Sequence, residues 1–344
     1  MKTKPIIWGS LALGLLAGQA AAEGQLNIYN WGNYIAPDLV TKFEAEHDVK
    51  VTVTEYDSSD TALAKIQAGG HGFDIWIGSS AYVPIYVQEG LLAESLPNQM
   101  ENFAHLAPKW VDVEFDPGRS YTIPWLWGTV GITVNTDMYK GEINTAALLF
   151  DTPDELKGKV NVVPEMRDVM GLAIYYLGGT DLCTDDKELL VKVRDLLVKA
   201  KENWISMDYS TLEQMVNGDY AATMDWNGPA MRARLQNPAI HYGYAATGYP
   251  TWMDNAAILA DAQNAENARL FMNFMMDPEN AAILSNFTRY ANGVAGSEPF
   301  MDPEMLDAPE IKVPAEFAEN TYFARTCSPE IEKIYSRIWT DVKK

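Results

Sequence analysis

Aromatic residues and carboxylates recur together in short, turn-like segments of this sequence. The segments are 31–34, 165–168, 225–228, 252–254 and 290–293. An ammonium group is attracted to an aromatic face by roughly 0.5–2 kcal/mol, and it donates charge-assisted hydrogen bonds to a carboxylate. If the fold brings these segments together, they form a binding site for an organic cation.

Each of these residues also has a purely structural interpretation. Glu165 and Asp168 stand one helical turn apart and would complement the dipole at the start of a helix. A lone tryptophan is more often a core residue than a ligand contact, and Asp254 after an aromatic residue is also typical of a turn. The cation site therefore depends on whether the surrounding elements converge.

The elements before residue 80 follow an α/β order. Strand-like runs at 25–31, 49–56 and 73–77 alternate with helix-like stretches at 36–47 and 58–68. This order predicts a lobe with a largely parallel sheet.

A similar alternation returns after residue 160. Strands are predicted at 162–163 and 221–225, and helices at 168–177, 186–203, 210–217, 264–276 and 278–287. In open α/β sheets, ligands bind beyond the carboxyl ends of the strands. Trp31, Ser79 and Trp226 all stand at such ends, which gives the scattered segments a reason to meet.

Length and charge narrow the class of protein. A chain of 344 residues exceeds what one core usually holds, so two lobes are expected. The formal net charge is −21, which disfavours binding to nucleic acid or to an anionic membrane surface. Charge alone fits a soluble exported protein at least as well as a binder of cations.

The first 22 residues have the pattern of a secretory signal peptide. Lys2 and Lys4 precede an apolar run at 6–16, and small residues end it at 20–22. The run is shorter than the roughly 20 residues that span a bilayer. We expect cleavage after Ala22, export to the periplasm and no stable membrane insertion.

Cys183 and Cys327 are the only cysteines. In an oxidising compartment they are candidates for a disulfide, but the sequence does not show whether they meet. The alternative is two buried small side chains. No C-x-x-C or Cys/His cluster is present, so we expect neither a metal nor a cofactor.

Ordered motifs along the mature chain resemble those of periplasmic spermidine/putrescine-binding proteins, the receptors of polyamine ABC transporters. The motifs are LNIYNWGNYIAPD at 26–38, GFDI at 72–75 with Ser79, PWLWGTVGI at 124–132, the acidic helix start at 165–168, WNG at 226–228, WMD at 252–254, YAN at 290–292 and SRIWT at 336–340. No one motif is unique, but the order and spacing of the set cover almost all of the mature chain.

The resemblance implies a two-lobed periplasmic binding protein of type II. This is an α/β fold of mixed, mostly parallel sheets with helices on both faces and a ligand cleft between the lobes. It implies lobe one from 23–132 plus 255–300 and lobe two from 133–254 plus 301–344, after the signal peptide at 1–22. We expect a monomer that delivers its polyamine to the membrane permease of the transporter.

The resemblance also implies which residues hold the ligand. Carried over by motif position, they are Trp31, Tyr34, Ser79, Tyr82, Glu165, Asp168, Trp226, Trp252, Asp254 and Tyr290. In this set the three tryptophans would face the methylene stem, which gains about 0.8 kcal/mol per buried CH₂. The three carboxylates would pair with the amines, since an unpaired buried charge costs several kcal/mol. Tyr34, Tyr290 and Ser79 would accept hydrogen bonds from the amine termini.

Two departures from the family pattern affect ligand identity. Gly32 stands where many members have Ser or Thr, and Pro229 stands where putrescine-type members can carry an acid. Putrescine, spermidine, cadaverine, agmatine and other guanidino compounds therefore all remain candidates.

Two other classes of function stay open at this stage. A polyamine sensor would need the same cleft as a transport receptor. An exported enzyme such as a glycosidase could use paired acids like Glu165 and Asp168. None of the four histidines adjoins a site motif, and the usual catalytic motifs are missing, so an enzyme is disfavoured.

Overall fold

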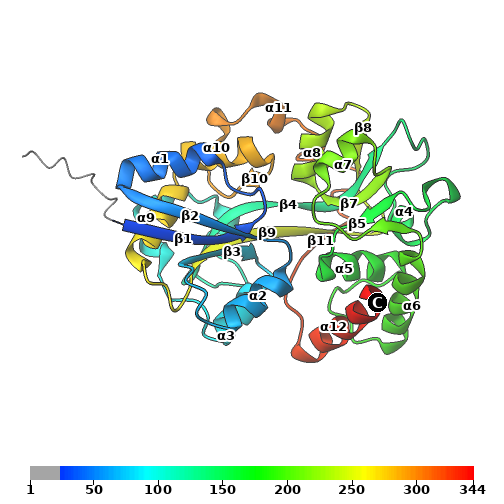
Figure 1. The fold of residues 1–344 in the computed structure, drawn as a ribbon, viewed down its shortest axis with the longest axis horizontal. Helices are drawn as coiled ribbons and strands as arrows, with labels where there is room; N and C mark the ends of the chain where they lie inside the picture. The colour runs from blue at the N-terminus through cyan, green and yellow to red at the C-terminus, as the bar shows by residue number, and fades with distance from the viewer. Residues whose placement is uncertain (1–23) are drawn as a thin grey trace, which may run out of the picture.

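The computed structural model describes residues 24–344. The predicted signal peptide, residues 1–22, lies outside the described residues. Figure 1 shows two groups of strands and helices, joined through the middle of the molecule by two long strands. The fold is α/β with a mixed sheet and helices on both faces, as predicted.

The first group follows the predicted order of strands and helices. Strand β1 (Gly24–Trp31) pairs in parallel with β2 (Val49–Tyr56) and with β3 (Ile75–Ser79). Helix α1 (Pro37–His47) connects β1 to β2, and α2 (Ser59–Gln67) connects β2 to β3. All three strands therefore end at the same edge of the sheet.

Two long strands cross between the groups. Strand β4 (Thr122–Asn135) pairs antiparallel with β9 (Tyr249–Ile258) through its first half. Its second half pairs antiparallel with β7 (Ala222–Trp226) and β8 (Ile240–Gly243). Parallel pairing resumes where β7 meets β5 (Val160–Val162), so each group has a parallel part and β4 is common to both.

Helices α5 (Met166–Tyr176), α6 (Lys187–Lys201) and α12 (Pro329–Lys343) pack together beside β5 and β7 (Figure 1). The other α-helices and strands are α3 (Val83–Gln88), α4 (Ala147–Phe150), β6 (Trp204–Ser206), α7 (Leu212–Asn217), α8 (Asn227–Gln236), α9 (Ala265–Met275), α10 (Pro278–Thr288), β10 (Ala291–Asn292), α11 (Pro303–Leu306) and β11 (Thr321–Phe323). We call the group around β1–β3 the β1 half and the group around β5–β7 the β7 half.

A disulfide joins Cys183 and Cys327, whose Cα atoms lie 5.2 Å apart. It ties the loop before α6 to the segment just before α12. The segment 321–328 begins with β11, which pairs in parallel with β9, and then runs to Cys327. The disulfide therefore anchors a segment that runs from the central strands to the β7 half.

Most of the predicted elements begin or end one or two residues away from the prediction. Strand β3 begins at Ile75 and ends at Ser79, two residues later than predicted at each end. Tyr82, a member of the predicted ligand set, stands immediately before α3 as its N-cap residue. The lobe boundaries given above stay a prediction.

Candidate functional site

A cleft of about 670 Å³ lies between the β1 half and the β7 half. All ten residues of the predicted ligand set line it: Trp31, Tyr34, Ser79, Tyr82, Glu165, Asp168, Trp226, Trp252, Asp254 and Tyr290. The segments that are scattered along the sequence thus converge in the fold.

Strand ends explain much of this convergence. Trp31, Ser79 and Trp226 are the last residues of β1, β3 and β7. Asp254 lies in the interior of β9, but the antiparallel register of β3 and β9 places it opposite Ser79. Glu165 reaches the same cleft as the N-cap residue of α5.

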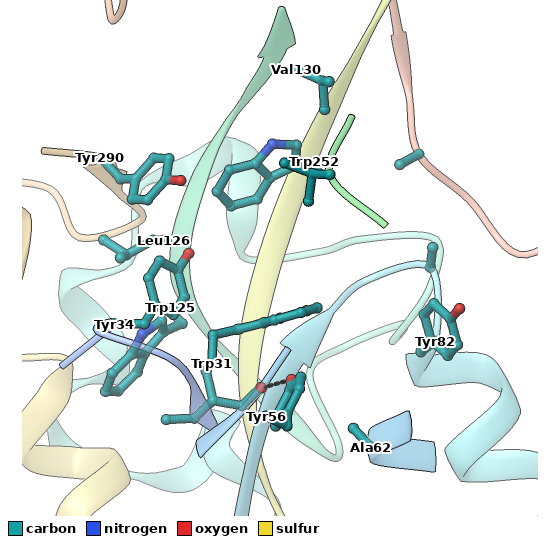
Figure 2. Close-up of a cluster of buried hydrophobic side chains, with 14 of the residues drawn as sticks. Trp31, Tyr34, Tyr56, Ala62, Tyr82, Trp125, Leu126, Val130, Trp252 and Tyr290 are labelled. Carbon is teal, nitrogen blue, oxygen red and sulfur yellow. Dashed lines mark hydrogen bonds between the residues drawn. The ribbon is translucent and has the colours of Figure 1, made fainter. Parts of the chain in front are cut away.

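Aromatic rings form the walls of the cleft. The ring centroids of Trp31 and Trp226, which come from different halves, lie 6.4 Å apart at an angle of 55°. Tyr290 meets Trp252 edge-on at 5.1 Å and Tyr34 edge-on at 5.6 Å. Figure 2 shows the rings of Trp31, Trp252, Tyr34 and Tyr290 gathered together. Such walls offer both flat apolar surface and π-faces for a cation.

The carboxyl groups of Glu165 and Asp168 are buried beside each other at the start of α5. Burial raises the pKa of Asp168 to about 7, against the lowering effects of the Trp226 indole N–H and of Arg167. Burial, together with repulsion from Asp168 and Asp60, raises the pKa of Glu165 well above its ordinary value. A positive partner in the cleft would favour the charged form of both groups.

Asp254 is the third buried carboxyl group of the cleft. Burial raises its pKa to about 7, and repulsion from Asp168 adds to the shift. The Tyr34 hydroxyl and the Trp31 indole N–H lie close enough to lower the pKa of Asp254 in part. Within residues 24–344, neither group makes a hydrogen bond to Asp254 or to any other residue. The Trp252 indole N–H also has no partner within residues 24–344.

The sequence interpretation missed several residues that line the cleft, among them Tyr209 and Arg232. The Tyr209 ring lies parallel to that of Trp31, with centroids 6.1 Å apart, and its hydroxyl donates to the Gly32 carbonyl at 3.3 Å. Tyr209 lies in the loop between β6 and α7, where no motif marks it.

Arg167 was named only as part of an acidic helix start, but its charge shapes one end of the cleft. Its guanidinium lies 4.5 Å from the centre of the Tyr82 ring and forms an ion pair with the half-buried Glu332 of α12. Tyr82 in turn donates to Asp60 at 2.9 Å. Asp225, by contrast, lies outside the cleft and accepts hydrogen bonds from Thr211 and the Trp226 backbone.

Among residues 24–344, no cluster of three or more His, Cys, Asp or Glu side chains is arranged to hold a metal ion. In the same part of the chain, no helix combines the length and apolarity needed to cross a bilayer.

Comparison with known proteins identifies the family. Residues 38–313 match the family model of bacterial extracellular solute-binding proteins. The chain belongs to this family. It is 30% identical over 314 residues to the spermidine/putrescine-binding periplasmic protein of Escherichia coli, an alignment that covers 91% of this chain and 90% of the relative.

Two further similarities extend over nearly the whole chain. The putrescine-binding periplasmic protein PotF of Escherichia coli is 26% identical over 358 residues, covering 98% of this chain and 96% of the relative. A solved structure described as a putative spermidine/putrescine ABC transporter from Listeria monocytogenes superimposes with a TM-score of 0.85 at 30% identity. That superposition covers 93% of this chain and 98% of the other. The two-lobed solute-binding fold implied by the sequence motifs is confirmed.

Proposed function

We propose that this protein captures a linear cationic amine of the polyamine class in its cleft and delivers it to the membrane permease of an ABC transporter. The names of its relatives support this ligand class, since they describe binders of putrescine and spermidine. The proposed contacts are the ten cleft residues of the predicted ligand set. The role is one of binding and release and needs no catalytic step.

The observation that carries the proposal is the set of buried carboxyl groups between aromatic walls. The pKa of Asp254 rises from 3.8 to about 7, which corresponds to a cost on the order of 4 kcal/mol for its charged form. A neutral ligand would leave this cost in place. An ammonium group at Asp254, or at Glu165 and Asp168, would offset it through charge-assisted hydrogen bonds.

Closure around the ligand follows from the two-lobed architecture, because hinged closure is an established motion of periplasmic binding proteins. Two sets of contacts cross the cleft. The Tyr209 hydroxyl donates to the Gly32 carbonyl, and the backbone N–H and hydroxyl of Ser59 each donate a long hydrogen bond of 3.4 Å to Oε2 of Glu165. The bound cation would supply the positive charge that offsets the buried carboxylates of the closed cleft, so binding favours the closed state.

We further propose the lobe division given by the resemblance, with β4 and β9 as the crossover strands. The mature protein would begin after Ala22, act in the periplasm and work as a monomer. The lining of the cleft by residues of both halves supports the lobe division, and the sequence pattern at 1–22 supports export.

A ligand screen tests the proposal. The mature chain would be heated with putrescine, cadaverine, spermidine, spermine, agmatine, amino acids and neutral sugars. A ligand that binds only the folded state raises the melting temperature, by an amount that grows with its concentration relative to Kd. We expect linear amines to raise the melting temperature. Calorimetry should show that Trp31→Ala lowers the affinity for them by tenfold or more. Stabilisation by sugars alone would contradict the proposal.

A further inference from the structure

Tyr209 lies in the cleft beside a tryptophan of each half. Its ring is parallel to that of Trp31 within 4°, with centroids 6.1 Å apart, and its centroid lies 5.6 Å from that of Trp226. The centroids of the two tryptophans are themselves 6.4 Å apart. Trp31 ends β1 and Trp226 ends β7, so the three rings form one aromatic wall that runs from one half to the other.

A hydrogen-bonded loop holds Tyr209 in this place. The side chain of the buried Asn161, in β5, accepts from the Asp208 backbone N–H at 2.9 Å and donates to the Asp208 carbonyl at 3.0 Å. Two residues after Tyr209, the Thr211 hydroxyl donates to Oδ2 of Asp225 in β7 at 3.0 Å. The residues on both sides of Tyr209 are therefore tied to strands of the β7 half, which fixes the base of its side chain.

From this base, Tyr209 reaches across the cleft to Gly32 of the β1 half. Its hydroxyl donates to the Gly32 carbonyl at 3.3 Å. A Cβ added at Gly32 would lie 3.4 Å from Cε1 of the Tyr209 ring, which is the distance of van der Waals contact. The ring thus occupies the space beside the Gly32 backbone, where a larger side chain would meet it.

The contact between Tyr209 and Gly32 depends on how closely the two halves approach. The hydrogen bond is already long, so an added separation of about 1 Å would break it. Closely packed side chains respond to a volume change of a single methylene group. A branch on the stem of a bound amine would therefore oppose the approach of Tyr209 to Gly32.

We infer that Tyr209 is a specificity-determining residue, which makes the cleft select amines with an unbranched stem over branched amines of the same charge. This inference rests on the proposed function and deepens it, because it adds the shape of the stem to the class of ligand. An unbranched stem leaves the wall of three rings and the contact with Gly32 intact. A branched stem would collide with the wall or hold the halves apart, and such a repulsive contact is a common source of specificity.

Amines that differ only in branching test this inference. Calorimetry would compare putrescine and cadaverine with derivatives that carry two methyl groups on one stem carbon not bonded to nitrogen. Both members of each pair have the same charge and the same ammonium donors. In the wild-type protein, we expect the unbranched member of at least one pair to bind about tenfold or more tightly, which is the discrimination that a change of one methylene in an apolar site can give.

Variants on both sides of the contact show whether Tyr209 causes the preference. Tyr209→Ala removes the ring and should reduce the preference to about threefold or less, whereas Tyr209→Phe keeps the ring and should retain most of it. Gly32→Val places methyl groups against the Tyr209 ring from the other half, so it should also reduce the preference even if Tyr209→Ala folds poorly. Tyr121→Ala, at a half-buried tyrosine outside the cleft lining, is the matched control and should change neither affinity nor preference. Circular dichroism and melting temperatures would check that each variant folds.

The outcomes separate the inference from the proposed function. If branched amines bind the wild-type protein as tightly as unbranched ones, the inference is overturned and the proposed function stands. The same holds if the folded Tyr209→Ala and Gly32→Val variants keep the full preference, because another part of the cleft would then select the stem. If no linear amine binds the wild-type protein, the proposed function fails, and the inference fails with it.

Discussion

The indole N–H of Trp226 donates a hydrogen bond to Oδ2 of Asp168 at 3.1 Å. Trp226 ends β7 and Asp168 lies in the first turn of α5, so the bond joins two elements at the cleft. It lowers the pKa of Asp168 while burial raises it. The tryptophan thus has two proposed roles, as a wall of the cleft and as a donor that stabilises a negative charge.

Replacement of Trp226 by phenylalanine separates these two roles. Trp226→Phe keeps an aromatic wall but removes the donor, so the pKa of Asp168 should rise further. A hydrogen bond to a charged group contributes about 1.5–3 kcal/mol. We therefore expect amine affinity to fall about tenfold at pH 6.5 and less at pH 8.5, where Asp168 is ionised more fully. Calorimetry at the two pH values measures the difference.

Trp204→Phe is the control for this substitution. The Trp204 indole N–H donates to the Leu149 carbonyl at 2.8 Å, and the residue is buried away from the cleft lining. The Trp204→Phe variant should be less stable than the wild type, but its affinity for amines should not fall in a pH-dependent way. An equal loss of affinity at both pH values in Trp226→Phe would show that only the shape of the wall matters.

Amine binding should weaken as the pH falls through about 7. In the free protein, Asp168 and Asp254 have pKa values of about 7, and that of Glu165 is raised in the same direction. A bound ammonium favours the ionised carboxylates and lowers their pKa values, so binding releases protons. Below pH 7, affinity should fall by about tenfold per pH unit for each carboxyl that must ionise. Alkylammonium groups stay charged over this range.

The proton release can be measured directly. Binding enthalpies would be determined at pH 7 in buffers of different ionisation enthalpy, and their slope gives the number of protons released. We expect a positive number at pH 7 and a value near zero at pH 9. Uptake of protons, or an affinity that is constant from pH 6 to pH 8, would refute the assignment of the buried carboxyls as amine partners.

Replacement of Asp254 by asparagine should weaken binding without weakening the ligand-free fold. The variant loses the charge partner of the amine, so affinity should fall at least tenfold, or about 1.4 kcal/mol. The stability of the ligand-free protein should change in the opposite direction to the affinity. A carboxyl whose folded-state pKa is raised to about 7 opposes folding as the pH rises above its unfolded value. At pH 8 the melting temperature of ligand-free Asp254→Asn should therefore equal or exceed that of the wild type.

Asp185→Asn removes an equal charge at an exposed position and serves as the control. It should change neither affinity nor melting temperature. If Asp254→Asn lost affinity and melted several degrees lower at pH 8, Asp254 would be a structural residue and its place in the ligand set would be wrong.

Strand ends made the general position of the site predictable from sequence. Trp31, Ser79 and Trp226 follow apolar runs that form β1, β3 and β7, and parallel strands bring such ends together. Asp254 is different, because it stands inside β9 and reaches the cleft through its register opposite Ser79. That register depends on long-range pairing, so the position of Asp254 came only from the resemblance to a family.

Other features depended on contacts that no local pattern encodes. No local pattern of the sequence marks Arg232 of α8 as a residue of the cleft, which it lines in the fold, where Gly228 of the same helix packs against Tyr290. Tyr209 lies in a loop and acquires its place by stacking on Trp31. The pairing of Cys183 with Cys327 also spans 144 residues, so sequence alone left it open.

Loss of the disulfide should lower stability more than affinity. Replacement of both cysteines by serine frees a loop of 144 residues in the unfolded chain, and removal of a native disulfide typically costs about 2–4 kcal/mol. Neither cysteine lines the cleft, although Ala324 of the same segment does. The Thr326 hydroxyl donates to the Ala81 carbonyl of the β1 half at 2.5 Å. We expect a lower midpoint in denaturant with amine affinity within about twofold of the wild type.

The wild-type protein under reducing conditions is the control and should behave as the double variant does. A large loss of affinity with an unchanged midpoint would mean that the bridge positions the segment 321–328 for closure and contributes little to the stability of the fold.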